Sequence, residues 1–266
     1  MALRVDNLTK TYGETTALSE VSFEIPAGSF AVVLGESGAG KSTLLRILNG
    51  LTEPTAGSVY LDGEEITNSR SDVGMVFQQH NLVAELSAYS NALTGTLNRT
   101  GFLRSLINRQ PIEDRELALE ALETVGLLDE AGQKVRSMSG GQQQRVGIAR
   151  ALVQQPALLL ADEPVASLDP SSAETVMEYL RETAETRDLT TLASLHQVHI
   201  AREFGEQFIG LRGGEVIFNG SREELTAGIL DRIYGDIETD EPHEGTETTA
   251  MDDSTQRPDT GIGTEI

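Results

Sequence analysis

The amino-acid sequence predicts an α/β protein built on a parallel sheet with helices on both faces. Two continuous apolar runs, at 30–34 and 157–161, have the length and composition of fully buried strands. The first run leads into a glycine-rich turn, and apolar residues at helical spacing follow at 44–48. A strand, a tight turn and a helix in this order form the basic unit of such a sheet.

The remaining elements follow from the same kinds of pattern. Further strands are expected at 3–8 and 21–25, joined by a turn-rich segment, and at 58–61, 73–77 and 189–195, with a hairpin-like pair around 212–214. Helices are expected at 113–125, from Gly140 to about Gln155 before Pro156, at 171–186, and from 197. Residues Ser221 to Glu224 have the form of a capping box, which predicts that the last helix starts there.

These elements predict one domain, 1–235, with a helical insertion at about 86–135. Residues 236–266 are mostly Thr, Asp, Glu and Gly, so we expect a disordered, solvating tail rather than a regulatory segment. The chain has no run of about 18 apolar residues and no basic-then-apolar N-terminus, which predicts a soluble, non-secreted chain. It also has no cysteine, which excludes disulfides and thiolate metal sites.

The chain is strongly acidic, with 42 acidic against 20 basic residues and a net charge of −22. Ten acids and one Arg lie in 236–266, which leaves the body at −13, and only three residues of the chain are lysines. This composition resembles that of proteins from salt-loving organisms, where salt screens charge repulsion beyond about 3 Å at 1 M. We therefore expect no nucleic-acid partner.

The turn that follows the first buried strand fits a phosphate-binding loop, G-x-x-x-x-G-K-[ST]. Its residues are Gly35, Glu36, Ser37, Gly38, Ala39, Gly40, Lys41 and Ser42, followed by Thr43. Glycines let the backbone curl so that several N–H groups and a helix N-terminus face one anion. Lys41 is expected to reach the β- and γ-phosphates of a nucleotide, and Ser42 to bind Mg²⁺. A purely structural glycine turn is the alternative, which the flanking strand, the Lys-Ser pair and the helix argue against.

Two further segments predict chemistry on a nucleotide. Asp162 and Glu163 end the second buried strand, at the sheet edge where open α/β sheets bind ligands. Asp162 is expected to hold Mg²⁺ through water, and Glu163 to accept a proton from the water that attacks the γ-phosphate. The backbone of Ser139-Gly140-Gly141-Gln142 precedes a helix and can face a second anion. One chain would therefore carry two half-sites for phosphate.

Together these motifs resemble the ATP-binding cassette (ABC) ATPases, whose signature is Leu-Ser-Gly-Gly-Gln; Met138 stands here in place of the Leu. The resemblance covers about residues 2–235. It implies a P-loop NTPase fold with a RecA-like core, a small antiparallel sheet and a helical subdomain. It also implies a head-to-tail homodimer, in which the signature of one subunit closes over ATP held by the phosphate loop of the other.

The resemblance also implies roles for individual residues. Tyr12 would stack on adenine, Gln78 would touch Mg²⁺ and the attacking water, and His196 would contact the γ-phosphate. Asp169 would lie in the loop that crosses the dimer interface. A half-buried strand-edge Tyr and a structural His are the alternative interpretations of Tyr12 and His196. Gln79 remains open beside Gln78, whereas the strand-end position favours His196 over its neighbour His199.

A single cassette with an uninterrupted helical subdomain resembles transporter subunits, which implies a separate membrane permease, a solute-binding protein that acts through it, and a place at the cytoplasmic face of the membrane. Segments 77–83, 93–95, 101–106, 195–198 and 201–204 resemble the phosphonate-importer ATPases, although Ser90 and Thr96 depart from that group's pattern. We therefore expect an ATPase subunit that energises uptake of phosphonate or a related phosphorus oxyanion. A soluble mechanochemical ATPase and the ATPase of an exporter or lipid-extracting complex are the alternatives.

Overall fold

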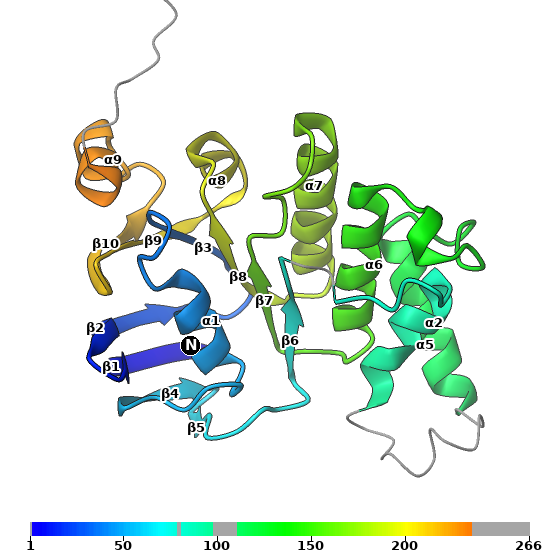
Figure 1. The fold of residues 1–266 in the computed structure, drawn as a ribbon, viewed down its shortest axis with the longest axis horizontal. Coiled ribbons are helices and arrows are strands. Elements are labelled where there is room, and N and C mark those ends of the chain that lie inside the picture. The colour runs from blue at the N-terminus through cyan, green and yellow to red at the C-terminus, as the bar shows by residue number, and fades with distance from the viewer. Residues whose placement is uncertain (1, 79–80, 98–110, 236–266) are drawn as a thin grey trace, which may run out of the picture. The chain divides into compact units, whose positions relative to one another are not determined.

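The computed structural model describes residues 2–78, 81–97 and 111–235 (Figure 1). By the contacts within the chain, residues 1–236 form one compact unit, and 237–266 form a second that lies outside the described residues. The expected tail at 236–266 is therefore not part of the description. The same holds for residues 98–110 of the helical insertion and for Gln79.

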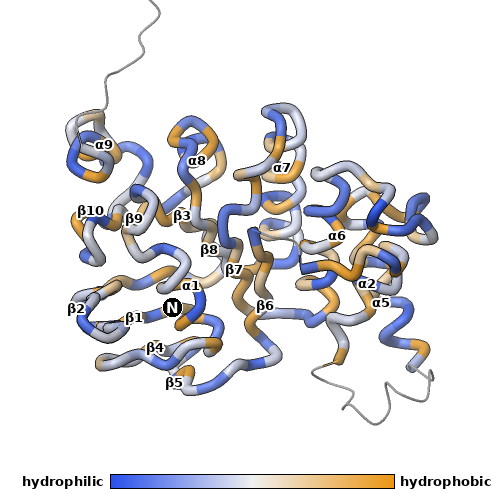
Figure 2. Tube along the Cα trace, in the orientation of Figure 1, coloured by the Kyte–Doolittle hydropathy of each residue, from blue (hydrophilic) through white to orange (hydrophobic). Residues whose placement is uncertain are grey.

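A six-stranded sheet forms the centre of the first unit, in the order β10-β9-β3-β8-β7-β6. Five strands run parallel: β3 (Phe30–Leu34), β6 (Val73–Val76), β7 (Leu158–Asp162), β8 (Thr190–Leu195) and β9 (Gln207–Arg212). Strand β10 (Glu215–Ser221) pairs antiparallel with β9. Every residue of β3, β7 and β8 is buried. Figure 2 shows that β6 and β7 are largely apolar along their length. The predicted parallel sheet is confirmed.

A second sheet is antiparallel and has four strands, in the order β2-β1-β4-β5. Its strands are β1 (Leu3–Tyr12), β2 (Thr15–Ile25), β4 (Ala56–Leu61) and β5 (Glu64–Glu65). The prediction of short strands at 3–8 and 21–25 was wrong in length, because Tyr12 pairs with Thr15 in a tight hairpin. The ladder has register shifts that interrupt its pattern, which is why sequence alone divided these strands.

Alternate side chains of β3 belong to two separate cores. Phe30, Val32 and Leu34 pack in a cluster with buried residues of α6 (Gly140–Leu152), α7 (Pro170–Thr186) and α8 (Val198–Phe204). Ala31 and Val33 pack on the other face, with α1 (Lys41–Leu48) and the antiparallel sheet. Because strand side chains alternate between faces, the central strands are covered on both sides. Residues 35–40 join β3 to α1, so the N-terminus of α1 lies at the carboxyl end of β3.

The helical insertion packs on α6. It contains α2 (Ala88–Leu93), the 3₁₀ turn η1 (Thr94–Thr96), α5 (Ile112–Thr124) and the 3₁₀ turn η2 (Val135–Ser137). Ala92, Ala118, Ala121 and Leu122 from this segment are buried in the same cluster as the α6 residues. Helix α6 ends at Leu152, slightly earlier than the expected Gln155, whose φ of 54° is left-handed and no longer helical.

The last helix, α9 (Ala227–Tyr234), starts later than expected. The prediction of a helix start at Ser221 was wrong, although Glu224 Oε2 does accept a hydrogen bond from the Ser221 N–H at 2.7 Å. Ser221 is still part of β10 and pairs with Gln207, so its backbone is not available to begin a helix. Thr226 caps α9 instead, and its hydroxyl accepts from the Ile229 N–H at 3.4 Å.

Candidate active site

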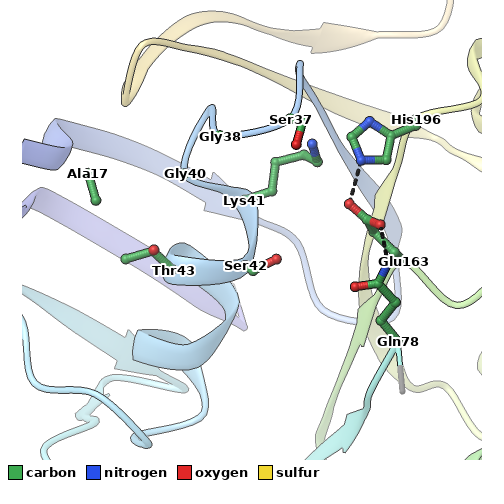
Figure 3. Close-up of a pocket in the computed structure, with 10 residues that line it drawn as sticks. All are labelled: Ala17, Ser37, Gly38, Gly40, Lys41, Ser42, Thr43, Gln78, Glu163 and His196. Carbon is green, nitrogen blue, oxygen red and sulfur yellow. Dashed lines mark hydrogen bonds and ion pairs between the residues drawn. The ribbon is translucent and has the colours of Figure 1, made fainter. Parts of the chain in front are cut away.

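A cavity of about 340 Å³ lies where the phosphate loop meets the carboxyl ends of the parallel strands. Its lining consists of Ala17, Ser37, Gly38, Gly40, Lys41, Ser42, Thr43, Gln78, Glu163 and His196. The loop residues form one side, and Gln78, Glu163 and His196 face them from the other (Figure 3). The structure therefore brings all four predicted catalytic side chains, Lys41, Gln78, Glu163 and His196, to one cavity.

Glycine is required at both ends of the loop, because backbone carbonyl groups of neighbouring strands lie too close for a side chain. Gly40 has a φ of 104°, and a Cβ there would lie 2.6 Å from the Ala17 carbonyl oxygen. A Cβ at Gly35 would lie 2.4 Å from the Leu211 carbonyl oxygen. The loop is thus held between β2 and β9. Ala17 was missed by the sequence interpretation, because its contribution is a backbone carbonyl that no motif marks.

Lys41 is nearly fully buried and turned back onto its own loop. Its ammonium donates to the carbonyl oxygens of Gly35 at 2.7 Å and Glu36 at 2.9 Å. Burial lowers the pKa of Lys41, while the carboxylates of Glu163 and Asp162 oppose this by favouring the charged form. A polyphosphate that enters the cavity offers stronger, charged acceptors than these two carbonyls, so Lys41 can transfer its hydrogen bonds to it.

Ser42 and Asp162 form an oxygen pair next to the loop. The Ser42 hydroxyl donates to Asp162 Oδ1 at 3.0 Å, and Asp162 is 6% exposed. A hydroxyl and a carboxylate are hard oxygen donors of the type that Mg²⁺ uses together with nucleotide phosphates. The residues present therefore fit Mg²⁺. The two residues lie 120 positions apart in the sequence, and the structure brings them into contact; their roles toward Mg²⁺ stay a prediction.

Ser194 was missed by the sequence interpretation, although it supports two of the site residues. Its hydroxyl donates to Asp162 Oδ1 at 2.9 Å and accepts from the backbone N–H of Glu163 at 2.9 Å. Ser194 is fully buried within β8. The signal available in the sequence was a serine near the end of a predicted strand, which ends at the same edge of the sheet as Asp162.

Glu163 is fixed at both carboxylate oxygens. Its Oε2 accepts from Gln78 Nε2 at 2.9 Å, and its Oε1 contacts His196 Nε2. Its backbone φ of 47° is left-handed, which costs a non-glycine residue about 1–2 kcal/mol. Strained backbone of this kind is concentrated at functional sites, where surrounding contacts enforce it.

The cavity distinguishes His196 from its competitor His199. His199 lines a different cavity, together with Leu168, Glu203 and Phe204, and is not part of the lining at the phosphate loop. Gln78 likewise contributes directly to the lining, whereas Gln79 lies outside the described residues. The strand-end position that favoured His196 thus agrees with the geometry.

The second predicted phosphate-facing turn begins α6. Ser139 and Gln142 form a capping box, in which the Ser139 hydroxyl accepts from the Gln142 N–H at 3.2 Å and the Ser139 N–H donates to Gln142 Oε1 at 3.0 Å. Asp169 caps α7 by accepting from the Ser172 N–H at 3.1 Å. The helix ends meet closely, since a Cβ at Gly141 would lie 3.2 Å from Ser172 Cβ.

This turn does not line the cavity of the phosphate loop. Ser139, Gly141 and Gln142 line a separate pocket with residues of α7. The structure therefore does not bring the two phosphate-facing turns of one chain together in a single pocket.

Tyr12 lies outside the cavity lining as well. Its side chain is 48% exposed at the end of β1, and Lys10 Nζ lies 4.9 Å from the ring centroid. Because the Tyr12 ring is exposed, it is open to stacking by a flat ligand.

Two further residues of the phosphate loop, which do not line the cavity, differ in exposure: Glu36 is exposed to solvent, and Ala39 is buried.

Comparison with known proteins identifies the family. The family model described as "ABC transporter" matches residues 18–166. The phosphonates import ATP-binding protein PhnC of Halobacterium salinarum is 62% identical over 248 residues, which cover 93% of this chain and 89% of that protein. PhnC 2 of Haloquadratum walsbyi is 62% identical over 262 residues, which cover 98% and 91%.

A solved structure also resembles the fold. The dimeric ATP-binding cassette MJ0796, in a post-hydrolysis state bound to ADP and Pi, is 37% identical with a TM-score of 0.71. The similarity covers 83% of this chain and 98% of that chain. Family match, relatives and structural neighbour agree with the resemblance predicted from the motifs, and this chain belongs to the ABC transporter family.

Proposed function

We propose that this chain is the ATP-hydrolysing subunit of an importer for phosphonates. The observation that carries the proposal is one cavity in which Lys41 and the Ser42–Asp162 pair face Glu163. The substrate class follows from relatives at 62% identity that are named phosphonates import ATP-binding proteins. Related phosphorus oxyanions share the same chemistry and are distinguished by the experiment below.

Within the site, catalysis is mainly electrostatic. Lys41 is placed to bind the β- and γ-phosphates as they replace the carbonyl oxygens of Gly35 and Glu36. Glu163 is placed to accept a proton from the attacking water, while Gln78 and His196 hold its two oxygens and orient it. Both of these partners can turn towards water or the γ-phosphate once nucleotide is present.

Mg²⁺ would be held by Ser42, Asp162 and Gln78, and it would neutralise charge on the phosphate oxygens. Asp162 takes its orientation from the Ser42 and Ser194 hydroxyls, so the carboxylate is set before the ion arrives. Preorganised ligands of this kind avoid the cost of ordering side chains during the reaction.

The separation of the two phosphate-facing turns supports a head-to-tail homodimer. The backbone at Ser139, Gly140, Gly141 and Gln142 would close over the ATP bound at the partner's loop, near Asp169. Tyr12 would stack on the adenine from its exposed position on β1. A dimeric cassette is described for the structural neighbour at 37% identity.

Transport requires a membrane partner outside this chain. Among the described residues, no helix has both the length and the apolar character needed to cross a membrane. We propose that separate permease subunits provide the path, that a solute-binding protein delivers the substrate, and that the cassette dimer binds at the cytoplasmic face. The acidic composition fits the salt-loving sources of the two relatives.

The test is reconstitution of the full chain with the permease and binding protein encoded beside it, in proteoliposomes at high salt. ATP hydrolysis should be stimulated by a phosphonate such as 2-aminoethylphosphonate, and less by phosphate or phosphite. Stimulation by phosphate or phosphite alone would overturn the substrate class. Isolation of an active soluble ATPase that binds no permease would overturn the transport role and favour a mechanochemical ATPase.

A further inference from the structure

Lys10 lies beside Tyr12, the residue proposed to stack on adenine. Both side chains come from strand β1, two residues apart, and Lys10 Nζ lies over the Tyr12 ring, 4.9 Å from its centroid. An ammonium group at this distance is attracted by the electron-rich face of an aromatic ring. Lys10 therefore covers one face of the ring, and a flat ligand can stack only on the other face.

A second contact fixes the ammonium group over the ring. Lys10 Nζ donates a hydrogen bond of 2.6 Å to the carbonyl oxygen of Glu53, in the segment between α1 and β4. That segment is itself bound to β1, because the Thr55 N–H donates to the Thr9 carbonyl oxygen at 2.8 Å and the Thr55 hydroxyl accepts from the Thr11 N–H at 3.0 Å. The Glu53 carbonyl thus gives the end of a long, flexible side chain a defined place.

The hairpin that carries Tyr12 borders the cavity at the phosphate loop. Tyr12 pairs with Thr15 across the turn between β1 and β2. Ala17, two residues further along β2, is part of the cavity lining (Figure 3). A nucleotide whose phosphates lie on the loop can therefore extend its base towards the Tyr12 ring.

We propose that Lys10 is a positioning residue for the base of the nucleotide and acts through Tyr12. Its ammonium group holds the ring in place and blocks one of its faces, so that the base stacks on the opposite face. Fixing the ring in advance lowers the entropy that is lost when the base binds. The inference rests on the proposed function, in which ATP binds in this cavity and Tyr12 stacks on adenine. Lys10 does not line the cavity, so we assign it no part in the chemical step.

The test uses the full chain in about 1 M salt and two ligands, Mg²⁺-ADP and Mg²⁺-pyrophosphate, whose Kd values are measured by isothermal titration calorimetry. Both ligands carry a diphosphate and only ADP carries a base, so an effect on base stacking changes the Kd for ADP alone. Salt at this concentration screens charges beyond about 3 Å, which weakens any direct attraction between Lys10 and the phosphates.

The variants separate the charge of Lys10 from its effect on the ring. Lys10→Met removes the ammonium group and keeps an unbranched side chain, whereas Lys10→Arg keeps a cation that can stack on the ring. Lys134→Met is the matched control, because Lys134 is an exposed lysine of the helical insertion that pairs with Glu85 at 3.3 Å. Tyr12→Ala removes the ring, and its combination with Lys10→Met completes a double-mutant cycle.

We expect Lys10→Met to raise the Kd for ADP about twofold to fivefold, the size of an exposed cation–π contact, and to leave the Kd for pyrophosphate unchanged. Lys10→Arg and Lys134→Met should bind both ligands as the unmodified chain does. Tyr12→Ala should raise the Kd for ADP further. Adding Lys10→Met to it should then have no effect, since the ring through which Lys10 acts is gone.

Three results for Lys10→Met would overturn the proposal. An unchanged Kd for ADP would show that the ammonium group does not support the base. An equal rise of the Kd for ADP and for pyrophosphate would assign Lys10 to charge or to fold stability. A lower Kd for ADP would show that the ammonium group occupies the ring face that the base needs.

Failure of the premises is visible separately. If Tyr12→Ala leaves the Kd for ADP unchanged, stacking on Tyr12 is overturned together with the role of Lys10, while the ATPase function stands. Absence of Mg²⁺-ADP binding by the unmodified chain would overturn the proposed function itself.

Discussion

The hydroxyl of Ser194 donates a hydrogen bond of 2.9 Å to Asp162 Oδ1, across neighbouring strands of the central sheet. The same hydroxyl accepts from the Glu163 N–H at 2.9 Å. One buried group thus fixes both the carboxylate proposed to hold Mg²⁺ and the backbone of the proposed general base. Ser194 is a positioning residue, since it acts through its two neighbours.

Replacing Ser194 by Ala should weaken the response of the ATPase to Mg²⁺. A hydrogen bond to a charged group contributes about 1.5–3 kcal/mol, so we expect about a tenfold higher Mg²⁺ concentration for half-maximal activity and a lower kcat. Thr191→Val is the matched control: it removes a fully buried hydroxyl from the same strand, one that bonds only weakly to the Leu189 carbonyl at 3.3 Å. Equal Mg²⁺ dependence in both variants would contradict the role of Ser194.

Glu163→Gln should remove turnover and keep ATP binding. The amide has nearly the shape of the carboxylate but cannot take a proton from water, and we expect kcat to fall at least about 10²-fold, by analogy with the loss of one transition-state contact. The ATP-bound dimer should accumulate and be visible by size-exclusion chromatography with light scattering. Glu123→Gln, on the exposed surface of α5, controls for the charge change. Near-normal turnover of Glu163→Gln would show that another group is the base.

Gly40→Ala should disrupt the phosphate loop by a steric clash. The new Cβ would lie 2.6 Å from the Ala17 carbonyl oxygen and 2.8 Å from Leu18 Cδ2, at a φ of 104°. We expect a loss of stability greater than about 1 kcal/mol and weaker nucleotide binding. Gly13→Ala separates the two causes, since Gly13 also has a left-handed φ, of 58°, but no atom within 4 Å of its Cβ. If calorimetry gave the same nucleotide affinity for both variants, the clash would be excluded as the cause.

Folding and activity should require high salt. The body retains a net charge of −13 without residues 236–266, and repulsion among its acids is screened beyond about 10 Å at 0.1 M salt but beyond about 3 Å at 1 M. Circular dichroism and ATPase assays across a KCl series should show a rise of Tm and activity with salt. Full activity and an unchanged Tm in dilute buffer would contradict this expectation.

Much of the site was predicted because its chemistry lies in short segments. The phosphate loop, the Asp162-Glu163 pair and the Ser139 turn each combine a local backbone requirement with the residue types that the chemistry needs. Continuous apolar runs likewise predicted the buried strands β3 and β7 within one residue of their ends. The start of α9 was predicted wrongly at Ser221, because Ser221 still belongs to β10 and Thr226 caps the helix instead.

The sequence by itself determined the fold class and the family, and it predicted the phosphate-binding segments, because these depend on residue types at short spacing. Only the tertiary structure decided that Ser194 holds Asp162 from 32 residues away, that Ala17 closes on Gly40, and that Ile233 lies against Gly210. These contacts depend on which strands and helices become neighbours. A buried hydroxyl or a backbone carbonyl acquires its role from such a neighbour, and no local pattern in the sequence records it.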